Sequence, residues 1–208
     1  MDQDNLTRKE RERLRHKQQI LNKALQLFSE KGFHLVSMQQ IAEASEFSVG
    51  TLYNFFVSKE ALFEELLDAC GSQTMDRLVP ILYGPGAETD RLRNFIRQLP
   101  VIIEQNGDVL RLYVSQFGTG AMMTPVRKNP EIRLGLITHL SDLIDSGIKS
   151  ELFRSVNPTI AATALMATSE TLVLELANRF DRVQAQEITL QLERLFVDGL
   201  LKSGDERP

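Results

Sequence analysis

Apolar residues recur every three or four positions along most of the chain, which is the spacing of one face of an α-helix. The first such segment follows Thr7 and Glu10, which have the spacing of a capping box, and it includes Ile20 and Phe28 before Gly32 provides a stop. It predicts a helix of about six turns. The sequence offers no convincing run of strands, so the pattern predicts an all-α fold.

Three helix starts then follow in close succession. Ser37 and Gln40 form a second capping box, and Ser48 and Ser58 stand where two further N-caps would. This crowding leaves room for two very short helices and the head of a longer one. The longer helix is predicted to run from Ser58 to about Leu78, before the next proline.

Later helices are predicted to begin at Asp90, Asp108, Asn129 and Asn157, and the last two starts are marked by a proline after the cap residue. A final helix is predicted over residues 183–202, which gives about nine helices in total.

Two of these later helices have apolar residues on more than one face. Residues 158–177 are apolar or small almost all round, and residues 183–202 carry two apolar stripes. A surface helix does not tolerate such faces. We therefore expect a second copy of the chain to cover part of this surface.

Composition describes an ordinary globular protein of 208 residues, with 42% hydrophobic and 25% charged residues. We find neither a secretory leader nor an apolar run of the roughly 20 residues that span a bilayer, so we expect no membrane partner and a cytoplasmic protein. Cys70 is the single cysteine, and we interpret it as a small buried apolar residue.

Charge is distributed unevenly along the chain. The first 59 residues contain nine Lys or Arg and seven Asp or Glu, whereas the whole chain has a net charge of −4. Within residues 8–17, six basic residues accompany two glutamates. This run is either a solvated helix face with local ion pairs or a surface that contacts a polyanion.

Residues 39–55 have the form of a helix-turn-helix unit, in which two short helices pack through a tight turn. Phe47, Leu52 and Phe56 can pack inward. Gly50, within the second short helix, is poor for helix stability. It either permits the close approach of another backbone or is a tolerated irregularity.

The stretch IAEASEFSVGTLYNFFVSKEALFEELL, with ILNKALQLFSEKGF and SMQQIA before it, closely resembles the DNA-binding signature of the tetracycline-repressor (TetR) family of bacterial regulators. The resemblance extends from about Lys17 to Cys70. It implies a DNA-binding domain of an arm and three helices over residues 1–60, and a ligand-binding and dimerisation bundle over residues 61–208. It further implies a repressor that binds a palindromic operator in double-stranded DNA as a homodimer and is released by a small apolar or amphiphilic effector.

The resemblance places DNA contacts on the second and third helices and at the head of the fourth, and the basic run adds cations. The predicted DNA-binding residues are Arg15, Lys17, Ser37, Gln39, Ser48, Val49, Gly50, Thr51, Tyr53, Asn54 and Lys59.

This sequence departs from the family pattern at two points. Glu46 and Phe47 stand where Gly and Val are usual in the turn, and the recognition helix has no Lys or Arg. Base discrimination is therefore expected from Thr51, Asn54 and Val49, and most of the affinity from phosphate contacts.

The effector site is predicted from apolar residues of the bundle together with one carboxylate. The candidates are Phe95, Leu99, Ile103, Tyr113, Phe117, Met122, Met123, Met166 and Glu170. Glu170 stands in an otherwise apolar helix and needs a partner, and an interface arginine or an exposed edge would explain it equally well.

The dimer interface is predicted on the last two helices, through Leu165, Leu172, Leu176, Ile188, Leu192, Leu195 and Phe196. Two other function classes stay open: a helical adaptor that binds protein and an all-helical enzyme. We expect no metal and no cofactor, because the three histidines are scattered and the sequence has no Glu-x-x-His pair.

Overall fold

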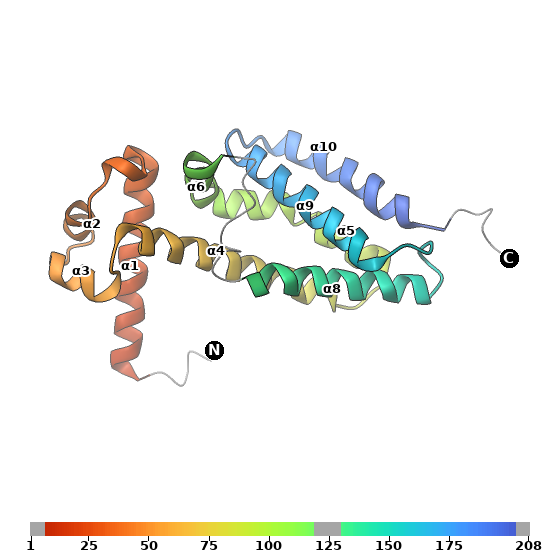
Figure 1. The fold of residues 1–208 in the computed structure, drawn as a ribbon, viewed down its shortest axis with the longest axis horizontal. Coiled ribbons are helices and arrows are strands. Elements are labelled where there is room, and N and C mark those ends of the chain that lie inside the picture. Colours follow the sequence, from red (N-terminus) through yellow and green to blue (C-terminus); the bar gives the residue numbers. More distant parts are fainter. Residues whose placement is uncertain (1–6, 119–129, 203–208) are drawn as a thin grey trace. The chain divides into compact units, whose positions relative to one another are not determined.

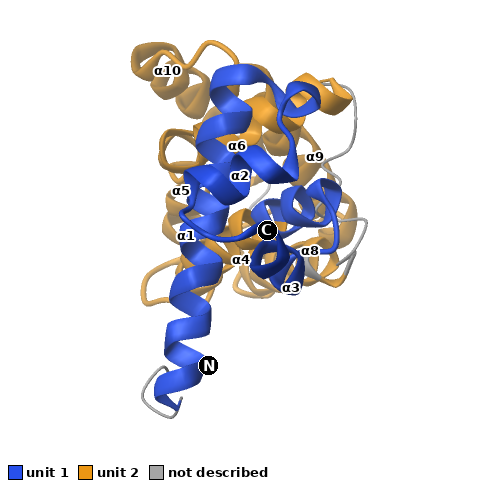
Figure 2. Cartoon of the chain, turned by 90° about the vertical axis from the view of Figure 1, so that its left-hand side faces the viewer, with its two compact units in different colours: residues 1–67 blue, residues 68–208 orange. Residues whose placement is uncertain are grey.

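The secondary structure of the chain is helical. The computed structural model describes residues 7–118 and 130–202, and in these ranges the only β-type pairing is one isolated antiparallel bridge between Phe153 and Leu201. The predicted all-α fold is confirmed (Figure 1). The chain divides into two compact units, Met1–Leu67 and Asp68–Pro208 (Figure 2), whereas the boundary was predicted after residue 60.

The first helix, α1, spans Arg8–Lys31 and begins with the predicted capping box. The hydroxyl of Thr7 accepts a hydrogen bond from the Glu10 amide at 3.3 Å, and the Glu10 carboxylate accepts one from the Thr7 amide at 2.8 Å. The helix ends at Gly32, which adopts a positive φ of 86° and donates its N–H to the carbonyl of Phe28. Both ends of α1 are thus determined by local residues, as predicted.

The rest of the first unit consists of η2 (Phe33–Leu35), α2 (Met38–Ala44), α3 (Val49–Phe55) and the first part of α4 (Lys59–Leu82). Serine N-caps begin α2, α3 and α4 as predicted. Side chains from these helices and α1 form the core. Its fully buried members include Ile20, Phe28, Ile41, Leu52 and Leu62.

Helix α4 continues past its predicted end at Leu78 and through Pro80 to Leu82, so that prediction was wrong. Proline removes one backbone hydrogen bond from a helix. Here the last turn buries Leu78 and Leu82, and Arg91 donates a hydrogen bond to the Leu82 carbonyl at 3.0 Å. Burial and this cap offset the cost of Pro80.

The second unit contains the end of α4, followed by α5 (Glu88–Ile96), α6 (Leu99–Phe117), α8 (Pro130–Lys149), α9 (Pro158–Ala177), α10 (Arg182–Leu192) and the π-helix η3 (Glu193–Asp198).

Some helix starts in this unit were predicted and others were missed. Asn157 caps α9 with its side chain, as predicted, whereas the predicted cap Asn129 lies outside the described residues. Helix α5 begins two residues before Asp90. Asp108 lies inside α6 and starts no helix, and the true start of α6 has no side-chain cap.

Helix α9 packs against both α8 and α6 (Figure 1). One face, which includes Leu165, Met166 and Val173, is buried in the unit. The opposite face is exposed, and Ile160 and Ala164 lie on it. By length and composition α9 reaches what a membrane crossing requires, although the sequence analysis expected no such run; its buried face belongs to the core.

The last helix is not one uninterrupted α-helix over residues 183–202. It changes to a π-helix at Glu193, a residue that is buried and paired with Arg97 through two hydrogen bonds of 2.7 and 3.0 Å. A π-helix places one extra residue in the turn. Periodicity in the sequence cannot reveal an ion pair between distant residues. This explains why the prediction missed the change to a π-helix at Glu193.

The turn between α2 and α3 contains the unusual Glu46, whose φ of 63° lies in the left-handed region. Its N–H donates to the Glu43 carbonyl at 3.1 Å, and the Phe47 N–H donates to Ala42 at 2.9 Å. The turn is therefore hydrogen-bonded, although a residue with a Cβ occupies the left-handed conformation that glycine adopts most readily.

The first testable prediction concerns this turn. Glu46→Gly relieves the left-handed strain, so we expect the free energy of unfolding of the protein to rise by about 1 kcal/mol. Lys23→Gly, at an exposed helical position of α1, is the matched control and should lower it by about 1 kcal/mol. Urea denaturation followed by circular dichroism measures both, and equal losses in the two variants would contradict the assignment.

Candidate functional site

Helix α3 presents an exposed, uncharged surface, which we call the α3 surface: Val49, Gly50, Thr51, Tyr53 and Asn54. Val49 is 38% exposed and Tyr53 is 51% exposed, Gly50 and Asn54 are exposed as well, and Thr51 is half-buried. This arrangement matches the predicted outward face.

The opposite side of α3 anchors it. Leu52 and Phe56 are buried, and Phe47 is half-buried with its ring 5.0 Å from that of His16. The exposed Ser48 caps the helix, because its hydroxyl accepts the Thr51 N–H at 3.1 Å, and it lies 2.8 Å from the Thr51 hydroxyl. These contacts fix which residues α3 turns outward.

Gly50 has free space around it. A Cβ atom built at this position meets no atom closer than the Ser48 hydroxyl oxygen at 4.0 Å, and its φ is not positive. Nothing among the described residues therefore requires glycine here. A tight contact inside the chain is excluded as its reason, so either the residue is tolerated or it serves an approach from outside.

The N-terminus of α2 is also exposed. The Ser37 hydroxyl accepts the Gln40 N–H at 3.2 Å, and the Gln40 side chain accepts the Ser37 N–H at 2.9 Å, so the predicted capping box is present. Gln39 is exposed and donates to Glu43 at 3.3 Å. Together, the starts of α2 and α3 offer hydroxyl and amide groups to solvent.

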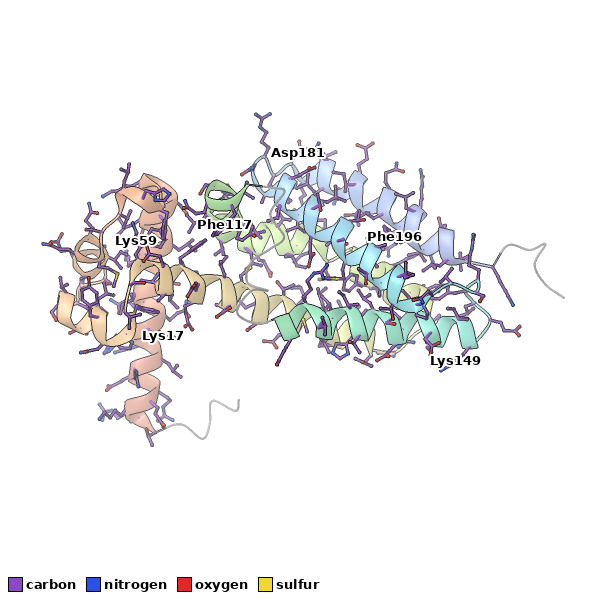
Figure 3. The ribbon with its side chains drawn as sticks, in the orientation of Figure 1. Lys17, Lys59, Phe117, Lys149, Asp181 and Phe196 are labelled. Atoms are coloured by element: carbon purple, nitrogen blue, oxygen red, sulfur yellow. The ribbon has the colours of Figure 1, made fainter. Side chains whose placement is uncertain are left out.

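Lys59 has a role that the sequence analysis did not predict. Its ammonium donates to the carbonyls of Phe33, His34 and Val36, at distances of 2.7, 3.4 and 2.9 Å, and it lies 4.6 Å from the centre of the Phe33 ring. These three bonds use all three ammonium protons. Lys59 (labelled in Figure 3) therefore holds the segment between α1 and α2, and its predicted contact with DNA stays a prediction.

The basic run of residues 8–17 is helical, as the first part of α1. Arg8 lies 3.8 Å from Glu12, and Lys17 pairs with Glu65 at 2.6 Å (Lys17 is labelled in Figure 3). Arg15 is exposed. One local ion pair and one pair with α4 thus account for part of this run, and Arg15 faces solvent.

The second unit contains a half-open cavity of about 120 Å³ with an almost entirely apolar lining. Four of the predicted effector-binding residues line it: Phe95, Leu99, Met166 and Glu170.

Three other predicted effector residues do not line this cavity. Ile103 and Tyr113 are buried elsewhere in the core, and Phe117 is exposed near the end of α6 (Figure 3). The predicted Met122 and Met123 lie outside the described residues.

One wall of the cavity was missed, because it comes from α4. Cys70, Thr74 and Leu78 line it at intervals of four residues, which is the spacing of one helix face and was visible in the sequence. Cys70 is buried, as predicted, and burial raises the pKa of its thiol to about 11. The other lining residues that sequence reasoning missed are Gly71, Met75, Ile102, Arg133, Leu136, Ser169 and Val173.

The partner of Glu170 in the folded chain is Arg133, which also lines the cavity. The Nε atom of Arg133 donates to both carboxylate oxygens of Glu170, at 3.0 and 3.2 Å, and both side chains are mostly buried. Beside them, Ser169 lines the cavity, and its buried hydroxyl has no hydrogen-bond partner among the described residues. The described lining of the cavity therefore includes an ion pair and one unsatisfied hydroxyl.

The residues predicted for a dimer interface differ in exposure. Leu165, Leu176 and Leu192 are buried in the core of their own chain, so their apolar character is explained without a second subunit. Leu172, Ile188 and Phe196 are half-buried, with Phe196 labelled in Figure 3. Leu195 is 69% exposed.

The first unit defines a helix-turn-helix protein, with α2 and α3 as the paired short helices. Residues 20–66 match the family described as bacterial regulatory proteins, tetR family. Over these residues the chain is similar to the DNA-binding segment of tetR-family regulators.

Relatives and solved structures agree with this assignment. The HTH-type transcriptional regulator UidR of Escherichia coli (strain K12) is 50% identical over 48 residues, which cover 23% of this chain and 24% of UidR. The match thus spans about a quarter of that relative's length. The uncharacterized HTH-type transcriptional regulator YhgD of Bacillus subtilis is 22% identical over 88% of this chain and 96% of its own.

A crystal structure of a putative TetR-family transcriptional regulator from Syntrophomonas wolfei extends the likeness to the whole fold. It superposes with a TM-score of 0.72 at 24% identity and covers 91% of this chain and 98% of its own. At this identity the likeness establishes the fold alone.

The second testable prediction concerns Lys59. Lys59→Met leaves the carbonyls of Phe33, His34 and Val36 without their charged donor, so we expect the free energy of unfolding to fall by about 2 kcal/mol. Lys31→Met, at an exposed position, should change it by less than about 0.5 kcal/mol. Chemical denaturation measures both. A Lys59→Met protein as stable as the control would mean that the ammonium does not hold this segment.

Proposed function

We propose that the chain is a transcriptional regulator that binds double-stranded DNA through the α3 surface. The observation that carries this proposal is the open space at Gly50, within an exposed face that lies in the family-matched segment. A glycine that weakens its own helix, and whose missing side chain would meet open space, fits a surface that another backbone approaches closely.

The chemistry of the α3 surface suits base edges better than phosphates. Thr51 and Asn54 supply hydrogen-bonding groups, and Val49 can contact the methyl group of thymine. Without Lys or Arg on α3, the affinity for phosphates must come from Tyr53, from the helix N-termini of α2 and α3 and from the basic part of α1. DNA binding should therefore depend strongly on salt, although the reading helix is neutral.

A palindromic operator requires two α3 surfaces, spaced about 34–36 Å apart or at a multiple of that distance. We propose that a homodimer forms through the exposed faces of α9 and α10. On α9 the exposed residues are mostly small, including Ala164 and Ala167, which permits close approach of a second helix. On α10 and the following segment, the large apolar residues Leu190 and Leu195 are exposed.

We further propose that the cavity of the second unit binds the effector. A ligand that binds better to a dimer with the wrong spacing lowers the affinity for the operator by linkage, by about 5- to 150-fold for typical couplings. Such a protein acts as a repressor in the cytoplasm. The matched relatives carry the names of transcriptional regulators, which argues against the adaptor and the enzyme.

The third testable prediction separates the two interpretations of Gly50. Gly50→Ala should raise the free energy of unfolding by about 0.5–1 kcal/mol, because alanine favours the helix and meets only open space. The same variant should bind an operator selected from random duplexes at least about tenfold more weakly, because the added methyl group meets the DNA. Fluorescence anisotropy measures the affinity.

The control for this variant is Ser29→Ala, at an exposed position of α1, which should leave the affinity unchanged. A Gly50→Ala protein that binds the operator as tightly as the natural chain would mean that Gly50 is only tolerated. Failure of the natural chain to select any duplex at low salt would contradict the proposed function.

The fourth testable prediction concerns the dimer. Ala164→Glu places a charge on the exposed face of α9, so we expect the dimer to dissociate at micromolar concentration while the helical content is retained. Lys149→Glu, at the exposed end of α8 (Figure 3), changes charge away from this face and should leave the dimer intact. Analytical ultracentrifugation distinguishes the two, and an Ala164→Glu dimer would place the interface elsewhere.

A further inference from the structure

Among the described residues that line the half-open cavity of the second unit, one polar atom is buried and unsatisfied: the hydroxyl oxygen of Ser169. The residue is 4% exposed, and this oxygen makes no hydrogen bond with any described group. Serine in a helix often bonds back to the carbonyl four residues earlier, as Thr168 does with Ala164 at 2.8 Å. Ser169 makes no such bond, so its hydroxyl is left for something that enters the cavity.

The other hydroxyl in the lining is already used. Thr74 donates to the Cys70 carbonyl at 2.9 Å, which satisfies its proton. Apart from Ser169, Thr74 and the ion pair, the described lining consists of Gly71 and of branched aliphatic, aromatic and sulfur-containing side chains. A ligand with several polar groups would leave most of them without partners and would lose affinity for each one.

The ion pair at the rim determines which charge the ligand can carry. Arg133 and Glu170 carry opposite charges and are joined through the Nε–H of Arg133, so together they present no net charge. A carboxylate that approaches Arg133 also meets the negative charge of Glu170. An amine that approaches Glu170 also meets the positive charge of Arg133. Each charged class therefore lies beside a like charge, and both are disfavoured.

The volume sets the size of the group that the cavity can hold. About 120 Å³ is close to the roughly 150 Å³ of an apolar protein cavity that binds benzene. One ring, or an alkyl group of similar volume, fills this space. An apolar body of that size with one polar group matches both the lining and the Ser169 hydroxyl.

We propose that the cavity binds a small neutral molecule with an apolar body of about one ring and a single hydroxyl group, which forms a hydrogen bond with Ser169. This inference rests on the proposed function only where it identifies that molecule as the effector. The binding chemistry itself depends on Ser169, on the Arg133–Glu170 pair and on the apolar lining.

The test measures binding of four single-ring probes by isothermal titration calorimetry with the full chain: 4-methylphenol, toluene, benzoate and benzylamine. We expect 4-methylphenol to bind at least tenfold more tightly than toluene, which lacks the hydroxyl. We expect both charged probes to bind at least a hundredfold more weakly than 4-methylphenol. Failure of 4-methylphenol to bind at millimolar concentration, or tighter binding of either charged probe, would overturn the proposal.

Ser169→Ala is the diagnostic variant. It should reduce the preference for 4-methylphenol over toluene to less than about twofold while leaving the affinity for toluene unchanged. Because the hydroxyl has no partner to lose, the melting temperature should not fall, which keeps the variant folded. Thr168→Ala, the neighbouring residue outside the cavity lining, is the matched control and should keep the full preference. An undiminished preference in Ser169→Ala would show that Ser169 does not bind the ligand.

A separate measurement distinguishes failure of this inference from failure of the proposed function. Operator affinity is measured by anisotropy with and without saturating 4-methylphenol, in the natural chain and in Ser169→Ala. If the probes bind with the expected preferences but 4-methylphenol leaves the operator affinity unchanged, the proposed binding chemistry is supported and the molecule is not the effector. If the chain binds an operator and releases it when benzoate is added, but does not respond to 4-methylphenol, the proposed regulator function is supported and the proposed class of ligand is wrong.

Discussion

Helix α3 is seven residues long, and a helix of that length is not stable in water by itself. Burial of Leu52 and Phe56 is therefore the constraint on which the whole α3 surface depends. The side chains that face outward do so because these two face inward, and the Ser48 cap fixes where the helix begins. An uncharged reading surface adds a second requirement: cations elsewhere in the protein must supply the attraction to DNA.

The second unit follows the same principle with different chemistry. Its cavity is bounded by apolar side chains from several helices, and its only described charges are locked together in the Arg133–Glu170 pair. Such a pair contributes little net stability compared with apolar residues of the same volume. What it does contribute is selectivity, because any charged ligand comes to lie beside a like charge. Among the described lining residues, Ser169 then provides the position where a polar group of a ligand gains a hydrogen bond.

Features with local causes could be predicted from the sequence. The caps at Thr7, Ser37 and Asn157 were found because a cap lies within three residues of the amide it binds. The course of α4 past Pro80 and the π-helix at Glu193 were missed, because they depend on burial and on a pair between distant residues.

In the candidate sites, periodicity identified apolar faces but could not tell which face was the chain's own core. Leu165 and Leu192, predicted for the interface, are core residues for that reason. Arg133 was missed because only the folded chain brings it to Glu170.

Three residues that break local rules lie in or next to the two candidate sites, whereas another, Glu151 with a φ of 61°, lies elsewhere. Glu46 adopts a left-handed conformation that costs about 1–2 kcal/mol for a residue with a Cβ, Gly50 weakens a short helix, and Ser169 buries a hydroxyl without a partner. None of these is explained by stability, since each has a simple replacement that favours folding. A chain selected only for stability would lose all three. Their presence in the turn, on the reading helix and in the cavity is what selection for contact with other molecules would leave behind.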